Sequence, residues 1–229
     1  MKKSEKAFRL LKEKQLIGLL TPETGDQCIR AYEILSPLGV TLEIAFRSEV
    51  AMEGIASVMK KYPDAIVLAG TVMTRGQAEQ AIGAGVSGVV SADYISAVVE
   101  VCVRNDIMCV PGGLGDVGKQ LAQKAELCGC AFEALHEKVP YQWIHKLFPA
   151  RTKTQSYVEL TRAWKGPFKG LTIVYTGGVN GDNLSEIVGF DPDGIFCGSA
   201  LTKEIEHPTQ MREEAEKWVS VIQNTKKGS

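Results

Sequence analysis

The sequence lacks an excess of charge of either sign. Its 26 lysines and arginines are matched by 27 aspartates and glutamates, giving a formal net charge of -1. Nucleic-acid and anionic-membrane partners favour a basic surface, so the composition argues against both. No apolar run reaches the roughly 18 residues that a membrane-spanning helix needs. The opening residues also lack the apolar segment of a secretory signal, so we expect a cytoplasmic protein.

Metal-ligand spacing is missing as well. The three histidines show no close pairing, and four of the six cysteines are scattered singly among apolar residues. Only Cys128 and Cys130 form a C-x-C pair. Without an export signal the thiols should stay reduced, and no zinc motif is present. We therefore expect no metal, no cofactor and no disulfide.

Short β-branched runs alternate with helix-like windows along the whole chain. Continuous apolar runs are typical of strands that are buried on both faces, and such βα alternation predicts a parallel sheet. The runs cover residues 16–21, 40–46, 65–70, 88–91, 107–112, 143–148, 171–178 and 194–199.

Eight such units in 229 residues predict one (β/α)8 TIM barrel domain over residues 1–229, opened by an amphipathic helix. The alternative is a doubly wound open sheet, but the first βα turn lacks the G-x-G-x-x-G fingerprint. Residues 113–142 exceed the repeat. They predict an elaborated loop, or a second helix, between strands five and six.

Charged residues interrupt two of the expected strands. Lys146 lies in the run 143–148, where it could either snorkel to solvent or stay buried. Glu43 and Arg47 alternate along the second strand, either as a structural ion pair or as functional groups. Together these residues suit Schiff-base chemistry, in which a neutral lysine attacks a carbonyl while a carboxylate moves protons. Arg47, with Gly70 and Thr71 after strand three, could bind a substrate carboxylate.

Glycine-rich turns follow the seventh and eighth strands. Gly177 and Gly178 close one of them, and Gly198 and Ser199 close the other. Glycine allows the backbone to approach an anion closely, and the loops after these strands form the usual phosphate site of a barrel. The turns therefore predict a phosphorylated substrate, unless they are only tight turns.

Six segments, LEIAFR, AGTVM, CVPGG, HKLFPA, YTGGV and CGSAL, occur in an order that resembles the 2-keto-3-deoxy-6-phosphogluconate (KDPG) aldolase family. That family also includes 4-hydroxy-2-oxoglutarate (KHG) aldolases and phosphogalactonate relatives. The resemblance covers about residues 10–205. It implies a class I, metal-free aldolase on a (β/α)8 barrel that assembles as a homotrimer.

The resemblance also implies roles for individual residues. Lys146 would form the Schiff base, and Glu43 would be the general acid/base, acting partly through water. Arg47 and Thr71 would hold the pyruvyl carboxylate, Phe148 would pack against the site, and the glycine turns would hold the distal phosphate.

Two loops depart from the family pattern. Ser91-Ala92-Asp93 replaces Ser-Pro-Gly after strand four, and a glycine-rich stretch after strand five lacks the usual Ser or Thr. Both loops would line the aldehyde half of the substrate, so the identity of the sugar acid is left undecided.

The function expected is reversible cleavage of a 2-keto-3-deoxy-phosphosugar acid, such as KDPG, to pyruvate and glyceraldehyde 3-phosphate. The alternatives are an aldolase for KHG or another short keto acid and a phosphosugar isomerase or epimerase. The latter would need no lysine in strand six. A non-catalytic binding protein would be expected to lack Lys146 or Glu43.

Overall fold

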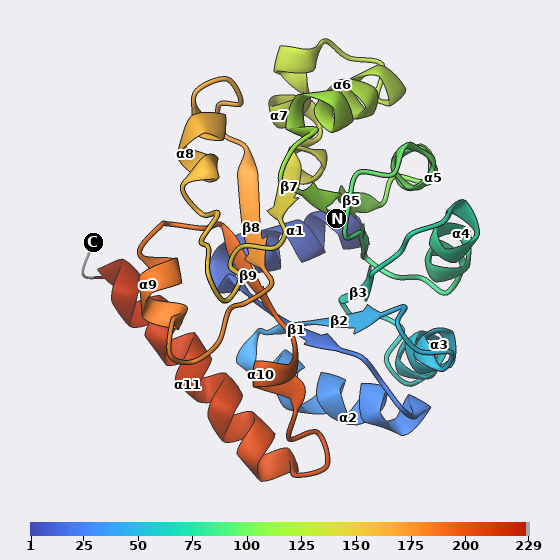
Figure 1. Ribbon diagram of the computed structural model, residues 1–229. Helices are drawn as coiled ribbons and strands as arrows, with labels where there is room; N and C mark the ends of the chain where they lie inside the picture. Colours follow the sequence, from blue (N-terminus) through green and yellow to red (C-terminus); the bar gives the residue numbers. More distant parts are fainter. Residues whose placement is uncertain (228–229) are drawn as a thin grey trace.

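The computed structural model describes residues 1–227, and in this range nine parallel strands form one sheet that curls into a barrel (Figure 1). Eight of the strands lie within the predicted runs, and the short β6 begins at the last residue of the fifth run, which also contains β5. The barrel prediction is confirmed, and the doubly wound alternative is wrong. The strands are β1 (Leu16–Leu20), β2 (Thr41–Ala45), β3 (Val67–Gly70), β4 (Gly88–Val90), β5 (Met108–Val110), β6 (Gly112–Gly113), β7 (Ile144–Leu147), β8 (Thr172–Thr176) and β9 (Gly194–Cys197).

The barrel closes through the chain itself. The strand order runs β5-β4-β3-β2-β1-β9-β8-β7-β6, and its two ends, β5 and β6, are separated only by Pro111. Proline has no N–H to continue a ladder, so the chain changes partner at this residue. β5 pairs with β4, and β6 pairs with β7. At the change of partner the carbonyl of Pro111 accepts a hydrogen bond from the Lys146 N–H at 2.9 Å.

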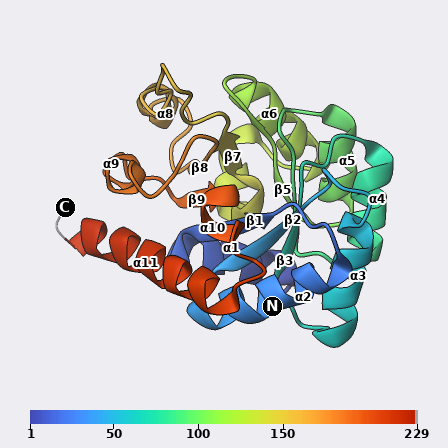
Figure 2. The same ribbon diagram turned by 60° about the horizontal axis from the view of Figure 1, so that its bottom comes forward.

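Helices surround the sheet on the outside, and α11 lies along α2 and α9 (Figures 1 and 2). The predicted loop between strands five and six contains α6 and α7. In the described range, none of the helices combines the length and apolar character needed to cross a membrane. The helices are α1 (Lys3–Lys14), α2 (Gly25–Leu35), α3 (Ala51–Lys61), α4 (Arg75–Gly83), α5 (Ser96–Arg104), α6 (Val117–Leu127), α7 (Leu135–Lys138), α8 (Leu160–Lys165), α9 (Leu184–Val188), α10 (Ser199–Thr202) and α11 (Pro208–Lys227), with 3₁₀ turns η1 (Ser36–Leu38), η2 (Phe132–Ala134) and η3 (Pro140–Gln142).

The opening helix α1 covers the amino-terminal end of the barrel, where it contacts β2, β5 and β9. The Ser4 hydroxyl accepts a hydrogen bond from the Met108 N–H at 3.0 Å and lies 3.1 Å from the Ser87 carbonyl. Ala7 and Leu11 of α1 join the apolar cluster inside the barrel. This end of the barrel is therefore filled, and the carboxyl ends of the strands remain for a site.

The pleat of the strands decides which polar side chains enter the barrel. Side chains alternate between the two faces of a strand. On β7, Ile144 belongs to the interior cluster, so Lys146 points inward as well. On β2, Leu42 and Ile44 pack against the outer helices, which turns Glu43 inward. The strand sequences thus bring a lysine and a glutamate into one barrel interior.

Candidate active site

Lys146 is a buried amine without a hydrogen-bond partner in the described chain. Its side chain is 5% exposed, so the snorkelling interpretation is wrong. Its Nζ lies 5.3 Å from the centre of the Phe148 ring. Burial lowers the pKa of Lys146 below lysine's ordinary 10.5; the negative charge of Glu43 opposes this shift, and Arg47 adds to it. The amine therefore loses its proton more easily than a lysine in water, as a nucleophile requires.

Glu43 faces the same interior with its carboxylate equally unpaired. Its side chain is 0% exposed, and within residues 1–227 neither oxygen has a hydrogen-bond partner. Burial raises the pKa of Glu43 above 4.5, although the positive charges of Lys146 and Arg47 oppose the shift. A carboxyl group that titrates nearer neutrality is suited to both giving and taking a proton.

The structural ion pair between Glu43 and Arg47 is not formed, so that interpretation is wrong. β2 ends at Ala45, and a tight turn follows in which the Arg47 N–H donates to the Ala45 carbonyl at 2.7 Å. Arg47 therefore lies beyond the strand and is exposed, instead of continuing the alternation. Its Nε donates to the Thr71 hydroxyl at 3.1 Å, and Thr71 has a left-handed φ of 54°. A left-handed backbone is strained for any residue other than glycine, and residues held in this conformation are found frequently at binding sites.

Gly70 provides the space that the Glu43 carboxylate occupies. A Cβ added to Gly70 would lie 1.8 Å from Oε1 of Glu43, which no real contact tolerates. The sequence suggested Gly70 as a backbone donor to a substrate carboxylate. The structure adds a steric requirement for glycine that the sequence did not predict.

Gly70→Ala should therefore force the carboxylate of Glu43 to move. We expect a loss of about 1–3 kcal/mol in the free energy of unfolding, as overpacked cores show, together with reduced turnover. The control is Gly76→Ala in α4, where an added Cβ meets nothing within 4 Å. It should leave stability unchanged or raised. Denaturant unfolding of both variants tests this, and wild-type stability and turnover in Gly70→Ala would contradict the position of Glu43.

A cavity of about 400 Å³ opens at the carboxyl ends of the strands and brings the predicted glycine turns together with Arg47 and Phe148. The two turns differ in their constraints. Gly178 has a φ of +74°, and a Cβ there would lie 2.1 Å from the Arg151 carbonyl oxygen. At Gly198 a Cβ would meet only Leu19, at 3.8 Å. The cavity is lined by Leu19, Arg47, Phe148, Thr176, Gly177, Gly178, Val179, Asn180, Phe196, Gly198, Ser199 and Ala200.

Two buried residues near Lys146 were missed from the sequence. Gly112 pairs with Lys146 across β6 and β7, and a Cβ there would lie 2.7 Å from Cε of Lys146. The Pro-Gly-Gly at the end of the fifth run is the signal that could have indicated it. Lys124 on α6 is a second fully buried lysine. It follows Val117 and Leu121 at helical spacing, so the period of α6 places it on the buried face.

Comparisons with a family model and with individual proteins point to the same aldolase family. A family model described as KDPG and KHG aldolase matches residues 8–210. The 2-dehydro-3-deoxy-phosphogluconate aldolase of Treponema pallidum is 29% identical over 194 residues, 84% of either chain.

Two solved structures share the fold. One is a KDPG aldolase from Legionella pneumophila with pyruvate captured as a covalent carbinolamine. It has a TM-score of 0.74 at 20% identity and covers 94% of this chain and 97% of that one. The other is the KDPG aldolase of Zymomonas mobilis with 3-phosphoglycerate, with a TM-score of 0.70 at 21% identity, covering 93% and 94%.

Proposed function

The chain belongs to the KDPG and KHG aldolase family, and from this premise we propose that it reversibly cleaves a 2-keto-3-deoxy-phosphosugar acid to pyruvate and a phosphorylated aldehyde such as glyceraldehyde 3-phosphate. It is a class I aldolase, a lyase that works through a Schiff base. The observation that carries the proposal is a buried amine, Lys146, and a buried carboxylate, Glu43, neither with a hydrogen-bond partner in the described residues, in one barrel interior.

The proposed mechanism begins with Lys146. Its neutral amine attacks the C2 carbonyl of the substrate to give a carbinolamine, which loses water to form an iminium. The iminium accepts the electron pair of the breaking C–C bond, so the aldehyde leaves and an enamine remains. Protonation of the enamine carbon and hydrolysis then release pyruvate and the free amine. Glu43 moves the protons, because its carboxyl group shares the barrel interior with Lys146 and titrates nearer neutrality.

Substrate binding is divided between the two ends of the site. Arg47 and Thr71 bind the carboxylate next to the keto group, and Gly70 lies beside them. Phe148 packs against the bound pyruvyl group. The mechanism needs no metal, and among the described residues no three His, Cys, Asp or Glu side chains are grouped to hold one.

The phosphate occupies the cavity between the turns formed by Gly177 with Gly178 and by Gly198 with Ser199. Gly198→Val should raise KM for a phosphorylated substrate, because its side chain would enter the cavity, where an added Cβ meets only Leu19. Borohydride trapping with pyruvate alone should stay nearly unchanged, since pyruvate occupies only the lysine end. Steady-state kinetics and trapping of the same variant test both points. An unchanged KM would contradict the assignment of the phosphate to this cavity.

A second candidate is an aldolase for KHG or another short keto acid, since the family includes both activities. It is favoured by the atypical loop at 91–93, where Asp93 is exposed and would lie 3.2 Å from a Cβ on Gly113. A carboxylate at this place would disfavour a second anion on the substrate, which favours a short keto acid without a distal charge over both KDPG and the dicarboxylate KHG. The deciding measurement is kcat/KM for 2-keto-3-deoxygluconate and 2-keto-3-deoxygalactonate, each with and without the terminal phosphate, and for KHG. The aldolase family match leaves no support for the isomerase or the non-catalytic alternative.

We also propose a homotrimer located in the cytoplasm. The assembly rests on the family resemblance and on exposed Met73 and Leu114, which follow β3 and β6 and would be covered by an interface there. Light scattering after size exclusion gives the mass directly. The location is supported by six unpaired cysteines, four of them buried, because such thiols persist in a reducing compartment.

A further inference from the structure

The second buried lysine, Lys124 of α6, has no part in the chemistry above. Its side chain is 0% exposed, and burial lowers its pKa to about 8. A buried ammonium is costly unless its hydrogens are donated. Its Nζ donates to three backbone carbonyls, those of Cys109 at 2.8 Å, Gln142 at 2.9 Å and Ile144 at 3.2 Å. Lys124 has therefore used all its donors, whereas Lys146 has used none.

The three carbonyls lie on the two sides of a gap in the sheet. Cys109 belongs to β5, while Ile144 opens β7 and Gln142, two residues earlier, ends the turn η3. In the part of the chain that the structure describes, no strand pairing joins β5 to β7. We call this gap the β5–β7 seam. The Lys124 ammonium supplies the hydrogen bonds across the seam that a backbone ladder supplies elsewhere.

The side chain of Gln142 spans the same seam at a neighbouring level. Its Oε1 accepts from the Cys109 N–H at 3.3 Å, and its Nε2 donates to the Ile107 carbonyl at 2.7 Å. Side chains thus close the barrel between β5 and the strand that carries Lys146. The backbone bond from the Lys146 N–H to Pro111 adds to them at the carboxyl end.

α6 makes a second buried contact with β7. Gln120, one turn before Lys124, places its Nε2 2.7 Å from Nδ1 of His145, and Nε2 of His145 lies 3.2 Å from the Gly113 carbonyl. A carbonyl only accepts, so Nε2 of the ring carries the proton and Nδ1 accepts from Gln120. Burial lowers the pKa of His145 to about 4, which keeps the ring neutral in this arrangement. The two residues that precede Lys146 in β7 are therefore both bonded to α6.

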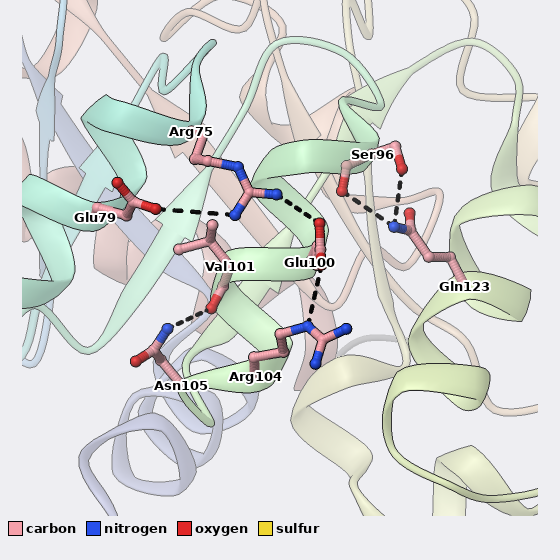
Figure 3. A network of polar contacts seen from close by, with 8 residues as sticks. All are labelled: Arg75, Glu79, Ser96, Glu100, Val101, Arg104, Asn105 and Gln123. Atoms are coloured by element: carbon pink, nitrogen blue, oxygen red, sulfur yellow. Dashed lines mark hydrogen bonds and ion pairs between the residues drawn. The ribbon is translucent and has the colours of Figure 1, made fainter.

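On its outer side α6 is fixed to α5 (Figure 3). Gln123 donates to the hydroxyl of Ser96 at 2.9 Å and to its carbonyl at 3.1 Å. α5 is joined in turn to α4 by an ion pair between Arg75 and Glu100 at 2.5 Å. α6 is thus held by the neighbouring helix while Gln120 and Lys124 reach inward to β7.

We propose that α6 positions the nucleophile: Lys124 holds β7 against β5, Gln120 ties β7 to α6, and together they fix where the Lys146 amine meets its substrate. The inference rests on the proposed role of Lys146 and gives a function to the segment inserted between strands five and six. A reacting group displaced by about 1 Å loses roughly 10²-fold in rate. Lys124 and Gln120 are positioning residues, since neither contacts the substrate.

The test is Lys124→Met, which keeps the unbranched apolar stem, one atom shorter, and removes the donors. At a temperature where the variant is folded, we expect kcat to fall about 10- to 100-fold. KM should stay within about threefold, because Arg47, Thr71 and the glycine turns follow strands other than β7. The control is Lys119→Met on the exposed face of the same helix, which should keep wild-type kcat. A purely structural role would lower the melting temperature and leave kcat unchanged in the folded variant.

Gln120→Leu gives an independent measurement and decides the matter if Lys124→Met does not fold. It leaves the buried Nδ1 of His145 without a donor, and it also removes an Oε1 that has no partner, so we expect a smaller loss of stability than in Lys124→Met. We expect a several-fold lower kcat with an unchanged KM. A folded Lys124→Met with kcat within twofold of wild type would overturn the proposal, as would the same result in Gln120→Leu. Failure of pyruvate trapping at Lys146 in the wild-type protein would instead refute the proposed function.

Discussion

Lys146→Arg should lower kcat by roughly 10⁴-fold or more, because no other group can form the covalent intermediate. A guanidinium keeps the positive charge and the approximate length of the side chain but stays protonated, so it cannot attack a carbonyl. The fold should survive, since Lys146 makes no side-chain hydrogen bond within residues 1–227 that arginine would break. Steady-state turnover and circular dichroism of the purified variant measure the two effects separately.

The control for this substitution is Lys60→Arg on the exposed face of α3, which should keep wild-type kcat. Lys146→Arg with a native spectrum and more than about a hundredth of wild-type turnover would mean that the chemistry does not pass through an imine at this position.

Glu43→Gln should lower kcat by about 10²- to 10⁴-fold, the usual size of general acid/base catalysis, while KM changes little. The amide keeps the shape of the side chain and its place over Gly70, but it no longer takes or gives a proton in the relevant range. Stability should not fall, because both carboxylate oxygens lack partners in the wild-type protein and no ion pair is lost. Steady-state kinetics and thermal unfolding measure the two quantities.

Glu216→Gln, at an exposed position of α11, serves as the matched control with no expected effect on kcat. Near-full kcat in Glu43→Gln would remove Glu43 from the mechanism. The buried carboxyl group would then need a different explanation, since the ion pair with Arg47 is not formed.

The strand period was sufficient to predict that Lys146 and Glu43 enter one barrel interior. Lys146 and Glu43 are charged residues inside apolar runs, and a residue-by-residue alternation already turns both toward one face. The same counting was wrong for Arg47, because β2 ends at Ala45 and the chain leaves the pleat in a tight turn. The residue at which a strand ends depends on its hydrogen-bond partners in the neighbouring strands, and the residues of an apolar run do not identify those partners.

Contacts between distant segments were the part that the sequence could not provide. The acceptors of Lys124 are backbone carbonyls at residues 109, 142 and 144, and a carbonyl carries no side-chain signal. The requirement for glycine at position 70 arises from a carboxylate 27 positions earlier in the chain. The helical spacing of α6 could have shown that Lys124 is buried, but not what it binds. The division of the fifth strand at Pro111 likewise depends on which strand lies on each side.

The most direct test of the central claim is reduction with borohydride in the presence of pyruvate, followed by intact mass and peptide mapping. The account predicts one reduced pyruvyl group per chain, on Lys146, with loss of activity in proportion to labelling. Lys124 provides an internal comparison, because it is also buried but has donated all three hydrogens to carbonyls, and it should remain unlabelled. An unmodified mass, or an adduct on Lys124 or any other lysine, would contradict the account.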